Sequence, residues 1–410
     1  MDHALDSIRN EFPILSRTLA GRLLAYLDNA ATTQKPISVT QTMIEHLALH
    51  NANINRGVHF LGEEATLAYD QARKTVQQFI HAHHTHEIIF TRNATESINI
   101  VARSWGEIFL QPGDSVVLSV MEHHSNIVPW LQLKEKIGIH LKWIDVDTEG
   151  NLDLDAYTQA LSDQSVKLVA MTGLSNVLGS MTPLKKIIAQ AQAAGALVAV
   201  DASQLIVHEP IDVQDLGCDF LAFTGHKLYG PTGIGVLYGR TSLLEKMPPF
   251  LGGGDMIQSV TRDHFTVAEL PRKFEAGTPA ITEAIGLRAA IQWIEKTGLD
   301  AIAKHEQSLL AHAQKRLSEI DGLTIFGPKN SAQRRGLISF TIDGTHPHDI
   351  TQILSDKGIC LRAGHHCTQP LHEHLGITAT TRLSVAAYNT MEEIDVCVDA
   401  LVEAQTRLAA

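Results

Sequence analysis

The chain has 410 residues, of which 44% are hydrophobic and 19% charged, a composition typical of globular proteins with a sizeable core. Its net charge of −12 argues against nucleic acid as a partner, because phosphate contacts need clustered Lys and Arg. No apolar run approaches the roughly 18 residues of a membrane span, and residues 1–10 lack the pattern of a secretory signal. The four cysteines suggest no disulfide framework, so we expect a cytoplasmic protein.

Short apolar runs alternate with longer amphipathic stretches through the first two-thirds of the chain. The runs predict buried strands at Ile88–Thr91, Ser115–Ser119, Leu141–Asp145, Leu168–Thr172, Leu197–Asp201, Phe220–Thr224 and Gly235–Tyr238. The stretches between them predict helices, among them Thr95–Trp105, Ile127–Lys136 and Leu184–Ala194. This alternation predicts an α/β fold with a mostly parallel central sheet and helices on both faces. Ligands of such sheets bind at the carboxyl ends of the strands.

A break near Pro271–Pro279 separates this part from the rest of the chain. A long helical stretch follows over Ile281–Ile320, interrupted at Gly298. The strands predicted after it are Leu323–Phe326, Leu337–Ile342, Ile359–Leu361 and Leu383–Val385, and the helices are Pro347–Asp356 and Met391–Leu408. We therefore expect a large domain of residues 20–285 and a small α+β domain of residues 1–19 and 286–410.

Two predicted strands end in residues with chemical potential. Asp201 follows the apolar run Leu197–Val200, and a partly desolvated carboxylate there suits a cationic ring nitrogen, although Asp is also a common helix N-cap. Lys227 follows Phe220–Thr224 in a Gly-containing turn, where desolvation lowers the pKa of an amine and prepares it for a Schiff base. The alternative is a surface lysine in a loop, and the Asp-x-x-Gln motif upstream makes that alternative less favourable.

Two further segments invite a ligand interpretation. Arg92–Ser97 follows a predicted strand and opens a helix. The start of a helix is a typical anion site, and the same residues could equally form a capping box. Four histidines cluster in one short stretch, at His81, His83, His84 and His86. We favour a solvated loop over a metal site, because zinc sites show cleaner ligand spacing and Cys or carboxylate partners.

Several motifs together resemble a known family. They are Asp201-x-x-Gln204, Thr224-Gly-His-Lys227, Met121-Glu-His123-His-Ser-Asn, Ser175-Asn176-Val-Leu-Gly and Phe274-Glu-Ala-Gly-Thr278-Pro. The set resembles the class V aminotransferases of the fold-type I pyridoxal-phosphate enzymes. Arg362-Ala-Gly-His-His-Cys367 and Arg382-Leu-Ser resemble the SufS-type cysteine desulfurases, also called selenocysteine lyases. The resemblance runs from about Ala25 to Thr390, with departures at Asn55, Asn93, Ala94, Leu251 and Ala363.

The resemblance implies a set of cofactor contacts. Lys227 would form the Schiff base with pyridoxal phosphate, Asp201 would pair with the protonated ring nitrogen, and His123 would stack on the ring and shuttle protons. The ring's phenolic oxygen would be bound by Asn176 and Gln204. The phosphate site would be formed by Ala94, Thr95, Thr224 and His226, with Thr278 from the neighbouring subunit.

The resemblance also implies the substrate and the partners. Arg382 would clamp the carboxylate of L-cysteine, or of L-selenocysteine, with Arg56, Arg362 and Asn176 beside it. The Cys367 thiolate would take the sulfur as a persulfide and leave alanine. The shared Thr278 implies a homodimer, and the short cysteine loop implies a sulfur-acceptor protein of the SufE or SufU type in iron–sulfur cluster assembly.

Two other functions compete with this interpretation. One is a different reaction on the same scaffold, such as that of an aminotransferase, an epimerase or a kynureninase-like lyase, which would not need the Cys367 thiol. The other is a non-catalytic scaffold, against which the presence of Lys227, Asp201, His123 and Arg382 argues.

Overall fold

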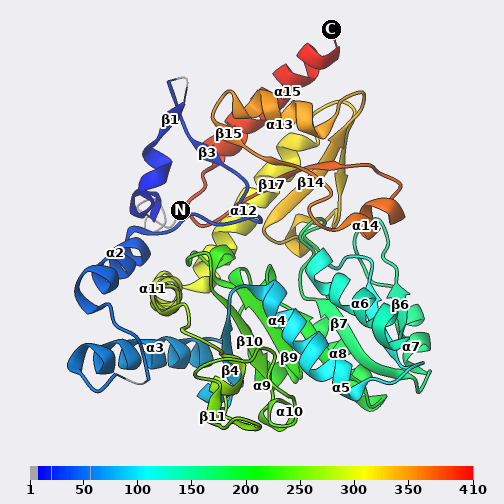
Figure 1. Cartoon of the computed structure of the whole chain (residues 1–410). Helices are drawn as coiled ribbons and strands as arrows, with labels where there is room; N and C mark the ends of the chain where they lie inside the picture. Colours follow the sequence, from blue (N-terminus) through cyan, green and yellow to red (C-terminus); the bar gives the residue numbers. More distant parts are fainter. Residues whose placement is uncertain (1–7, 20, 56, 410) are drawn as a thin grey trace.

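The computed structural model describes residues 8–19, 21–55 and 57–409. Its centre is a seven-stranded sheet in the order β4-β10-β9-β8-β7-β5-β6 (Figure 1). The strands are β4 (Ile88–Thr91), β5 (Ser115–Ser119), β6 (His140–Ile144), β7 (Val166–Thr172), β8 (Leu197–Asp201), β9 (Phe220–Thr224) and β10 (Gly235–Gly239). In the run β9-β8-β7-β5-β6 each strand is parallel to the next, whereas β10 is antiparallel to both of its neighbours, β4 and β9. The predicted α/β fold with a mostly parallel sheet is confirmed.

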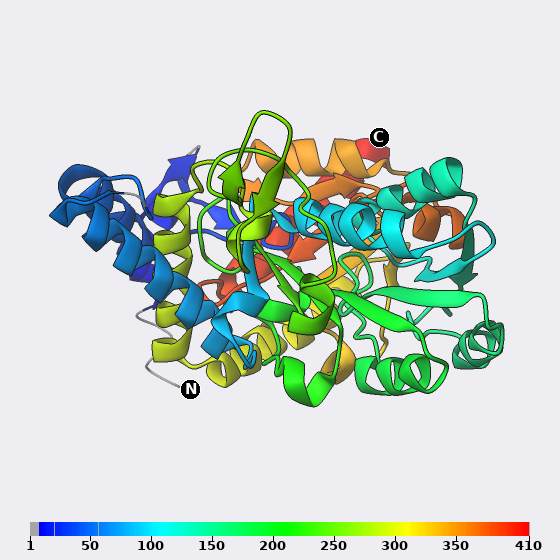
Figure 2. The ribbon, with the colours of Figure 1, turned by 60° about the horizontal axis from the view of Figure 1, so that its bottom comes forward.

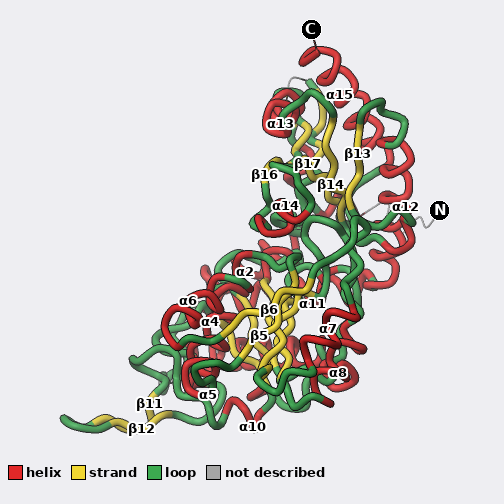
Figure 3. Tube along the Cα trace, turned by 90° about the vertical axis from the view of Figure 1, so that its right-hand side faces the viewer, coloured by secondary structure: helices red, strands yellow, loops and turns green. Residues whose placement is uncertain are grey.

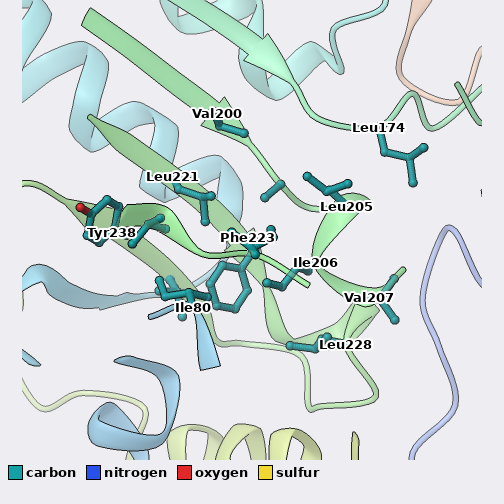
Figure 4. Packing of buried hydrophobic residues seen from close by; sticks show 14 of the residues in the cluster. Ile80, Leu174, Val200, Leu205, Ile206, Val207, Leu221, Phe223, Leu228 and Tyr238 are labelled. Atoms are coloured by element: carbon teal, nitrogen blue, oxygen red, sulfur yellow. The ribbon is translucent and has the colours of Figure 1, made fainter. Parts of the chain in front are cut away.

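The central sheet is buried on both faces, which explains why its strands read as continuous apolar runs. Every residue of β9 is buried, and alternate side chains enter different clusters. Leu221 and Phe223 pack with Val200 and Tyr238 in one cluster (Figure 4), whereas Phe220 and Ala222 belong to the cluster on the other face.

Helices lie on both sides of this sheet (Figure 2). One cluster includes side chains of α3 (Phe60–Phe79), α7 (Leu154–Leu161), α8 (Leu184–Ala193) and α11 (Ile281–Thr297). The cluster on the opposite face includes side chains of α4 (Ala94–Ile100), α6 (Val128–Ile137) and α10 (Thr241–Leu244). The remaining helices of this part are α2 (Ile37–Glu45), α5 (Glu107–Phe109) and α9 (Val213–Leu216). The predicted helix Thr95–Trp105 is α4 continued by a π-helical turn over Val101–Gly106.

A second, smaller sheet stands apart from the central one (Figure 3). It has the order β13-β14-β17-β16, formed by Leu323–Phe326, Leu337–Ile342, Thr380–Ser384 and Arg362–Gly364. Its own hydrophobic cluster is completed by α12 (Leu299–Leu317), α13 (Pro347–Ser355) and α15 (Met391–Ala409). The break between α11 and α12 falls at Gly298, as predicted.

Some sequence predictions need correction here. The strand predicted at Leu383–Val385 is β17, which starts three residues earlier at Thr380. The strand predicted at Ile359–Leu361 is β15 (Ile359–Cys360), which pairs with β3 (Ala25–Tyr26) outside the four-stranded sheet. The hairpins β1 (Thr18–Leu19) with β2 (Arg22–Leu23) and β11 (Ile257–Val260) with β12 (Phe265–Val267) were not predicted.

The N-terminal segment packs against both parts of the chain. Phe12 contacts the rings of Tyr229, Trp293 and Tyr388 at centroid distances of 6.1, 5.4 and 4.5 Å. The division into residues 20–285 and residues 1–19 with 286–410 stays a prediction. Among the described residues, none of the helices combines the length and the apolar character that crossing a bilayer would require.

Candidate active site

A cavity of about 190 Å³ lies where three parallel strands end. Thr172, Asp201 and Thr224, the last residues of β7, β8 and β9, all line it, as expected for a ligand site in an open α/β sheet. Twelve of the residues predicted from the sequence meet here: Ala94, Thr95, His123, Asn176, Asp201, Gln204, Thr224, His226, Lys227, Arg362, Cys367 and Arg382.

Lys227 ends a single 3₁₀ turn, Gly225–Lys227, that follows β9 directly. Desolvation lowers the pKa of its amine from 10.5 to about 8, against the opposing attraction of Asp201. The turn is held at the carbonyl of His226, which accepts from the Thr32 hydroxyl at 3.0 Å, the Thr33 N–H at 3.1 Å and the Lys35 ammonium at 3.0 Å. The geometry therefore presents a fixed amine that is deprotonated more easily than an exposed lysine.

Asp201 is buried beside this amine at the end of β8. One carboxylate oxygen accepts the N–H of Ser203 at 2.9 Å, so the side chain stabilises a turn rather than capping a helix. Gln204, three residues on, donates to the carbonyl of Ala30 at 2.8 Å. Asp201 lines the cavity, where its carboxylate can receive a cation.

The N-terminal end of α4 approaches the start of β10 very closely. Asn93 caps the helix by accepting the N–H of Glu96 at 2.9 Å, and the Thr95 hydroxyl lies 2.7 Å from that of Ser125. A Cβ on Gly235 would lie 2.4 Å from the carbonyl carbon of Asn93, a distance that no side chain tolerates. Glycine at 235 therefore permits the close approach of β10 to the start of α4, whose residues Ala94 and Thr95 line the cavity, and a helix N-terminal end suits an anion.

His123 lies on the short turn that follows β5. Its Nδ1 accepts the N–H of Ser125 at 3.1 Å, which leaves Nε2 to carry the proton of the neutral ring. Desolvation, followed by the charge of Lys227, lowers its pKa to about 4. Beside it, Glu122 is fully buried between Ser119 and Asn126, and burial raises its pKa to about 7. Sequence reasoning quoted Glu122 only as part of a motif.

Two arginines face each other across strands β16 and β17. Arg362 pairs in register with Arg382, and like charges in that position repel unless an anion lies between them. Arg382 is buried and donates to the Asn176 carbonyl at 2.9 Å and to the Asp28 carboxylate at 3.3 Å. Within the described part of the chain, its Nε has no hydrogen-bond partner. Burial lowers its pKa to about 10. The pair is suited to a carboxylate.

Cys367 is exposed in the loop between β16 and α14 (Gln369–His374). His366 and Cys367 adopt φ values of +52° and +58°, which non-glycine residues rarely adopt. Asn176 holds this loop, since its amide donates to the His366 carbonyl at 2.7 Å and accepts the Thr368 hydroxyl at 3.0 Å. The loop thus brings a thiol to the cavity that Lys227 lines.

One predicted site residue, Thr278, does not meet the others. Thr278 is exposed in a separate hollow with Asn53, Gly254 and Asp255, so it does not reach this cavity within one chain. Arg56 lies outside the described residues.

The histidine cluster follows α3 and precedes β4, in the region predicted as a loop. His81 pairs with Asp212 at 3.0 Å, and His86 lies 2.9 Å from the Thr241 hydroxyl. The rings of His84 and His86 stack at 4.9 Å. In the part of the chain that the structure describes, no three ligating side chains converge as a metal would need.

The donor set of the cavity fits pyridoxal phosphate. An amine of lowered pKa suits its aldehyde, a buried carboxylate suits its ring nitrogen, and the N-terminal end of α4 with Thr95 and His226 suits its phosphate. Desolvation lowers the pKa of His226 to about 4, so its ring is neutral at physiological pH.

Comparison with known proteins gives the same answer. The family model Aminotransferase class-V matches residues 25–397. A probable cysteine desulfurase of Streptomyces coelicolor is 48% identical over 97% of this chain and 96% of its own length. A cysteine desulfurase of Haloferax volcanii is 43% identical over 99% and 98%.

Two solved structures match nearly the whole chain. The apo cysteine desulfurase of Thermococcus onnurineus NA1 matches with a TM-score of 0.92 at 40% identity, covering 97% of each chain. The cysteine desulfurase CsdA of Escherichia coli, in its S-sulfonic acid form, matches with 0.91 at 39%, covering 98% of each. The chain therefore belongs to the class V aminotransferase family and, within it, to the cysteine desulfurases.

Proposed function

We propose that this protein uses pyridoxal phosphate to convert L-cysteine into L-alanine and keeps the sulfur as a persulfide on Cys367. The observation that carries the proposal is one cavity lined by an amine of lowered pKa, two facing arginines and an exposed thiol. A transaminase or an epimerase has no use for the thiol, and a scaffold has no use for the amine.

The cofactor would be held by groups on three strand ends and one helix end. Bound pyridoxal phosphate supplies an electron sink that weakens the bonds around the substrate's Cα. Lys227 would bind its aldehyde carbon, Asp201 would keep its ring nitrogen protonated, and Asn176 and Gln204 would bind its phenolic oxygen. The phosphate would be bound by Ala94, Thr95, Thr224 and His226.

The substrate carboxylate would lie between Arg362 and Arg382. An anion there would add to Asp28 in offsetting the repulsion of the two guanidinium groups. Asn176 lies beside them, and Arg56 completes the predicted set. His123, neutral with its proton on Nε2, would stack on the cofactor ring and move protons to and from the substrate.

Cys367 would act as the nucleophile. Its thiolate sulfur bonds to the substrate's sulfur while the substrate's Cβ–S bond breaks and its electron pair stays with Cβ. Protonation of that carbon leaves alanine, and the protein keeps the second sulfur. L-selenocysteine would be accepted at the same site.

A homodimer with shared active sites is part of the proposal. Thr278 would reach the phosphate in a neighbouring copy, which agrees with its exposure away from its own cavity. Ile44, Leu49, Val58, Phe60 and Leu67 expose 62–98% of their surface on and around α2 and α3, which project from one side of the molecule (Figure 1). Exposed apolar surface of this extent favours burial against a second chain.

The sulfur would leave on an acceptor protein of the SufE or SufU type and enter iron–sulfur cluster assembly. The exposure of Cys367 supports transfer to a partner rather than to a second internal thiol. All four cysteines are free, which supports a reducing, cytoplasmic setting.

Alanine release from L-cysteine with a reductant tests the proposal. We expect equal amounts of alanine and sulfide, loss of turnover in Cys367→Ala, and normal turnover in the control Cys360→Ala, whose thiol does not line the cavity. Turnover of Cys367→Ala at the unmodified rate would overturn the assignment of the nucleophile. Release of alanine from a keto acid without sulfide would favour a transaminase.

A further inference from the structure

His124 joins the segment that carries His123 to the loop that carries Cys367. Its backbone N–H donates to the carbonyl of Cys367 at 2.7 Å. Its ring Nε2 accepts the N–H of Gln369 at 3.1 Å. The proposed function assigns nothing to this residue, which is half-buried next to the cavity and does not line it.

The side-chain contact completes a helix end. Gln369 is the first residue of α14, and the first N–H groups of a helix need acceptors from outside it. The side chain of the N-cap residue Thr368 accepts none of them, and its hydroxyl is directed instead at the Asn176 side chain, to which it donates. His124, which is distant along the chain, therefore supplies the helix cap that the Thr368 side chain does not supply.

The loop that this cap anchors is strained. His366 and Cys367 are two successive non-glycine residues with left-handed φ, a backbone conformation that costs free energy for residues with a side chain. Such a conformation persists only where its surroundings over-determine it. Asn176 holds the middle of the loop, and the two bonds of His124 hold its carboxyl end against the His123 segment.

We propose that His124 is a positioning residue whose neutral imidazole caps α14 and so keeps the Cys367 thiol in register with His123. The proposal rests on the proposed function for its effect on turnover, but not for its effect on the loop. Loss of the cap releases the strain at His366 and Cys367 and lets the thiol leave the cavity.

The cap is sensitive to protonation. Nε2 accepts the Gln369 N–H only while it carries no proton, and a protonated ring offers a second donor where an acceptor is needed. Burial, then the nearby His365, lowers the pKa of His124 below its ordinary 6.5. The cap is therefore present above that lowered pKa and is lost as pH falls through it. The titratable groups around it are His123, His365 and Cys367.

Two substitutions separate the cap from simple packing. His124→Leu removes the acceptor, whereas His124→Gln keeps one that does not titrate near neutral pH. His374→Gln is the matched control, because His374 also ties α14 to the central part of the molecule, through the Val146 carbonyl at 2.8 Å, but at the other end of the helix.

Hydrogen exchange of the Gln369 amide in the holoenzyme reads the loop directly. At about pH 7.5 we expect exchange about tenfold faster in His124→Leu than in the unmodified protein, and unchanged in His124→Gln and His374→Gln. At a second, acidic pH below the lowered pKa of His124, only the unmodified protein and His374→Gln should lose protection beyond the intrinsic pH dependence, which the non-titrating His124→Gln reports. The proposal would be overturned if the Gln369 amide were as well protected in His124→Leu as in the unmodified protein at both pH values.

The rate at which sulfur from L-cysteine appears on Cys367 is the second readout. We expect a fall of about tenfold in His124→Leu with unchanged cofactor absorption, and rescue in His124→Gln. A fall that His124→Gln does not rescue would also overturn it. If the unmodified protein forms no persulfide, the proposed function fails, while hydrogen exchange still decides the role of His124.

Discussion

The lysine turn and the cysteine loop line the same cavity but are built in opposite ways. Lys227 is half-buried at the end of a central strand, and its turn is fixed by residues that belong to one short segment, Thr32–Lys35. Cys367 is exposed in a strained loop that is fixed by two separate segments, at Asn176 and at His124. The residues that fix the lysine turn are similarly far away along the chain, 191–194 positions from His226. We call the strand ends, the lysine turn and the N-terminal end of α4 the rigid wall of the cavity, which would hold the cofactor. We call the cysteine loop the movable wall, which would deliver the sulfur atom.

Removing the lysine gives the largest expected effect and should leave the loop alone. Lys227→Ala takes away the amine that binds the cofactor aldehyde, so the visible absorption of the holoenzyme and all turnover should disappear. The hydrogen bonds of Asn176 to the loop should persist, so alkylation of Cys367 by iodoacetamide should change only through the lost electrostatic interaction between Lys227 and Cys367. Lys186→Ala, at an exposed helical position, is the control. Retained visible absorption in Lys227→Ala would show that another amine holds the cofactor.

Gly235→Ala should damage the rigid wall next. The added Cβ would meet the backbone of Asn93 at 2.4–2.5 Å, and backbone cannot move aside as a flexible side chain can. Displacing the N-terminal end of α4 should weaken binding of pyridoxal phosphate by about tenfold or more, measured by equilibrium titration of the apoprotein. Gly252→Ala, where a Cβ would meet nothing within 4 Å, should bind normally. Equal affinities would mean that the α4 end does not bind the phosphate.

The movable wall is probed by a pair of adjacent threonines. The Thr380 hydroxyl bonds to the rings of both His366 and His372, whereas the buried Thr381 hydroxyl has no hydrogen-bond partner among the described residues. Thr380→Val should therefore cost about 1–3 kcal/mol of stability and speed alkylation of Cys367 several-fold. Thr381→Val should be neutral. A neutral Thr380→Val would show that the histidine contacts do not hold the loop.

The smallest expected effect is a shift in a pH midpoint. The neutral amine of Lys227 is the nucleophile, so combination of the apoprotein with pyridoxal phosphate should speed up as pH rises through about 8. Asp201→Asn removes a charge that favours the ammonium form and should move this midpoint down. Arg382→Gln removes one that disfavours it and should move the midpoint up. Shifts in the reverse directions, read by stopped-flow absorption, would refute the electrostatic account.

The rigid wall could be predicted from the sequence almost completely. Buried strands can be recognised as apolar runs. Both ends of each of the seven central strands lie within two residues of their predicted positions. Asp201 and Lys227 were found because each follows such a run directly. Their placement in one cavity then follows from the rule that parallel strands end at the same edge.

The movable wall could be predicted only in part. The motif around Cys367 was recognised, but strand β16 and the left-handed pair His366–Cys367 were not, because nothing in a His-His-Cys run demands positive φ. The contacts of His124 and of Asn176 with this loop join positions far apart in the chain, and no local pattern reports them. Glu122 was missed as a buried acid for the same reason, since its partners appear only after folding.

Mass analysis of the peptide that carries Cys367, after a single turnover with L-cysteine, tests the central claim most directly. The account predicts one alanine per active site and a gain of one sulfur atom on that peptide and on no other cysteine. Alanine without added sulfur on Cys367, or a coloured holoenzyme that forms no alanine, would contradict it.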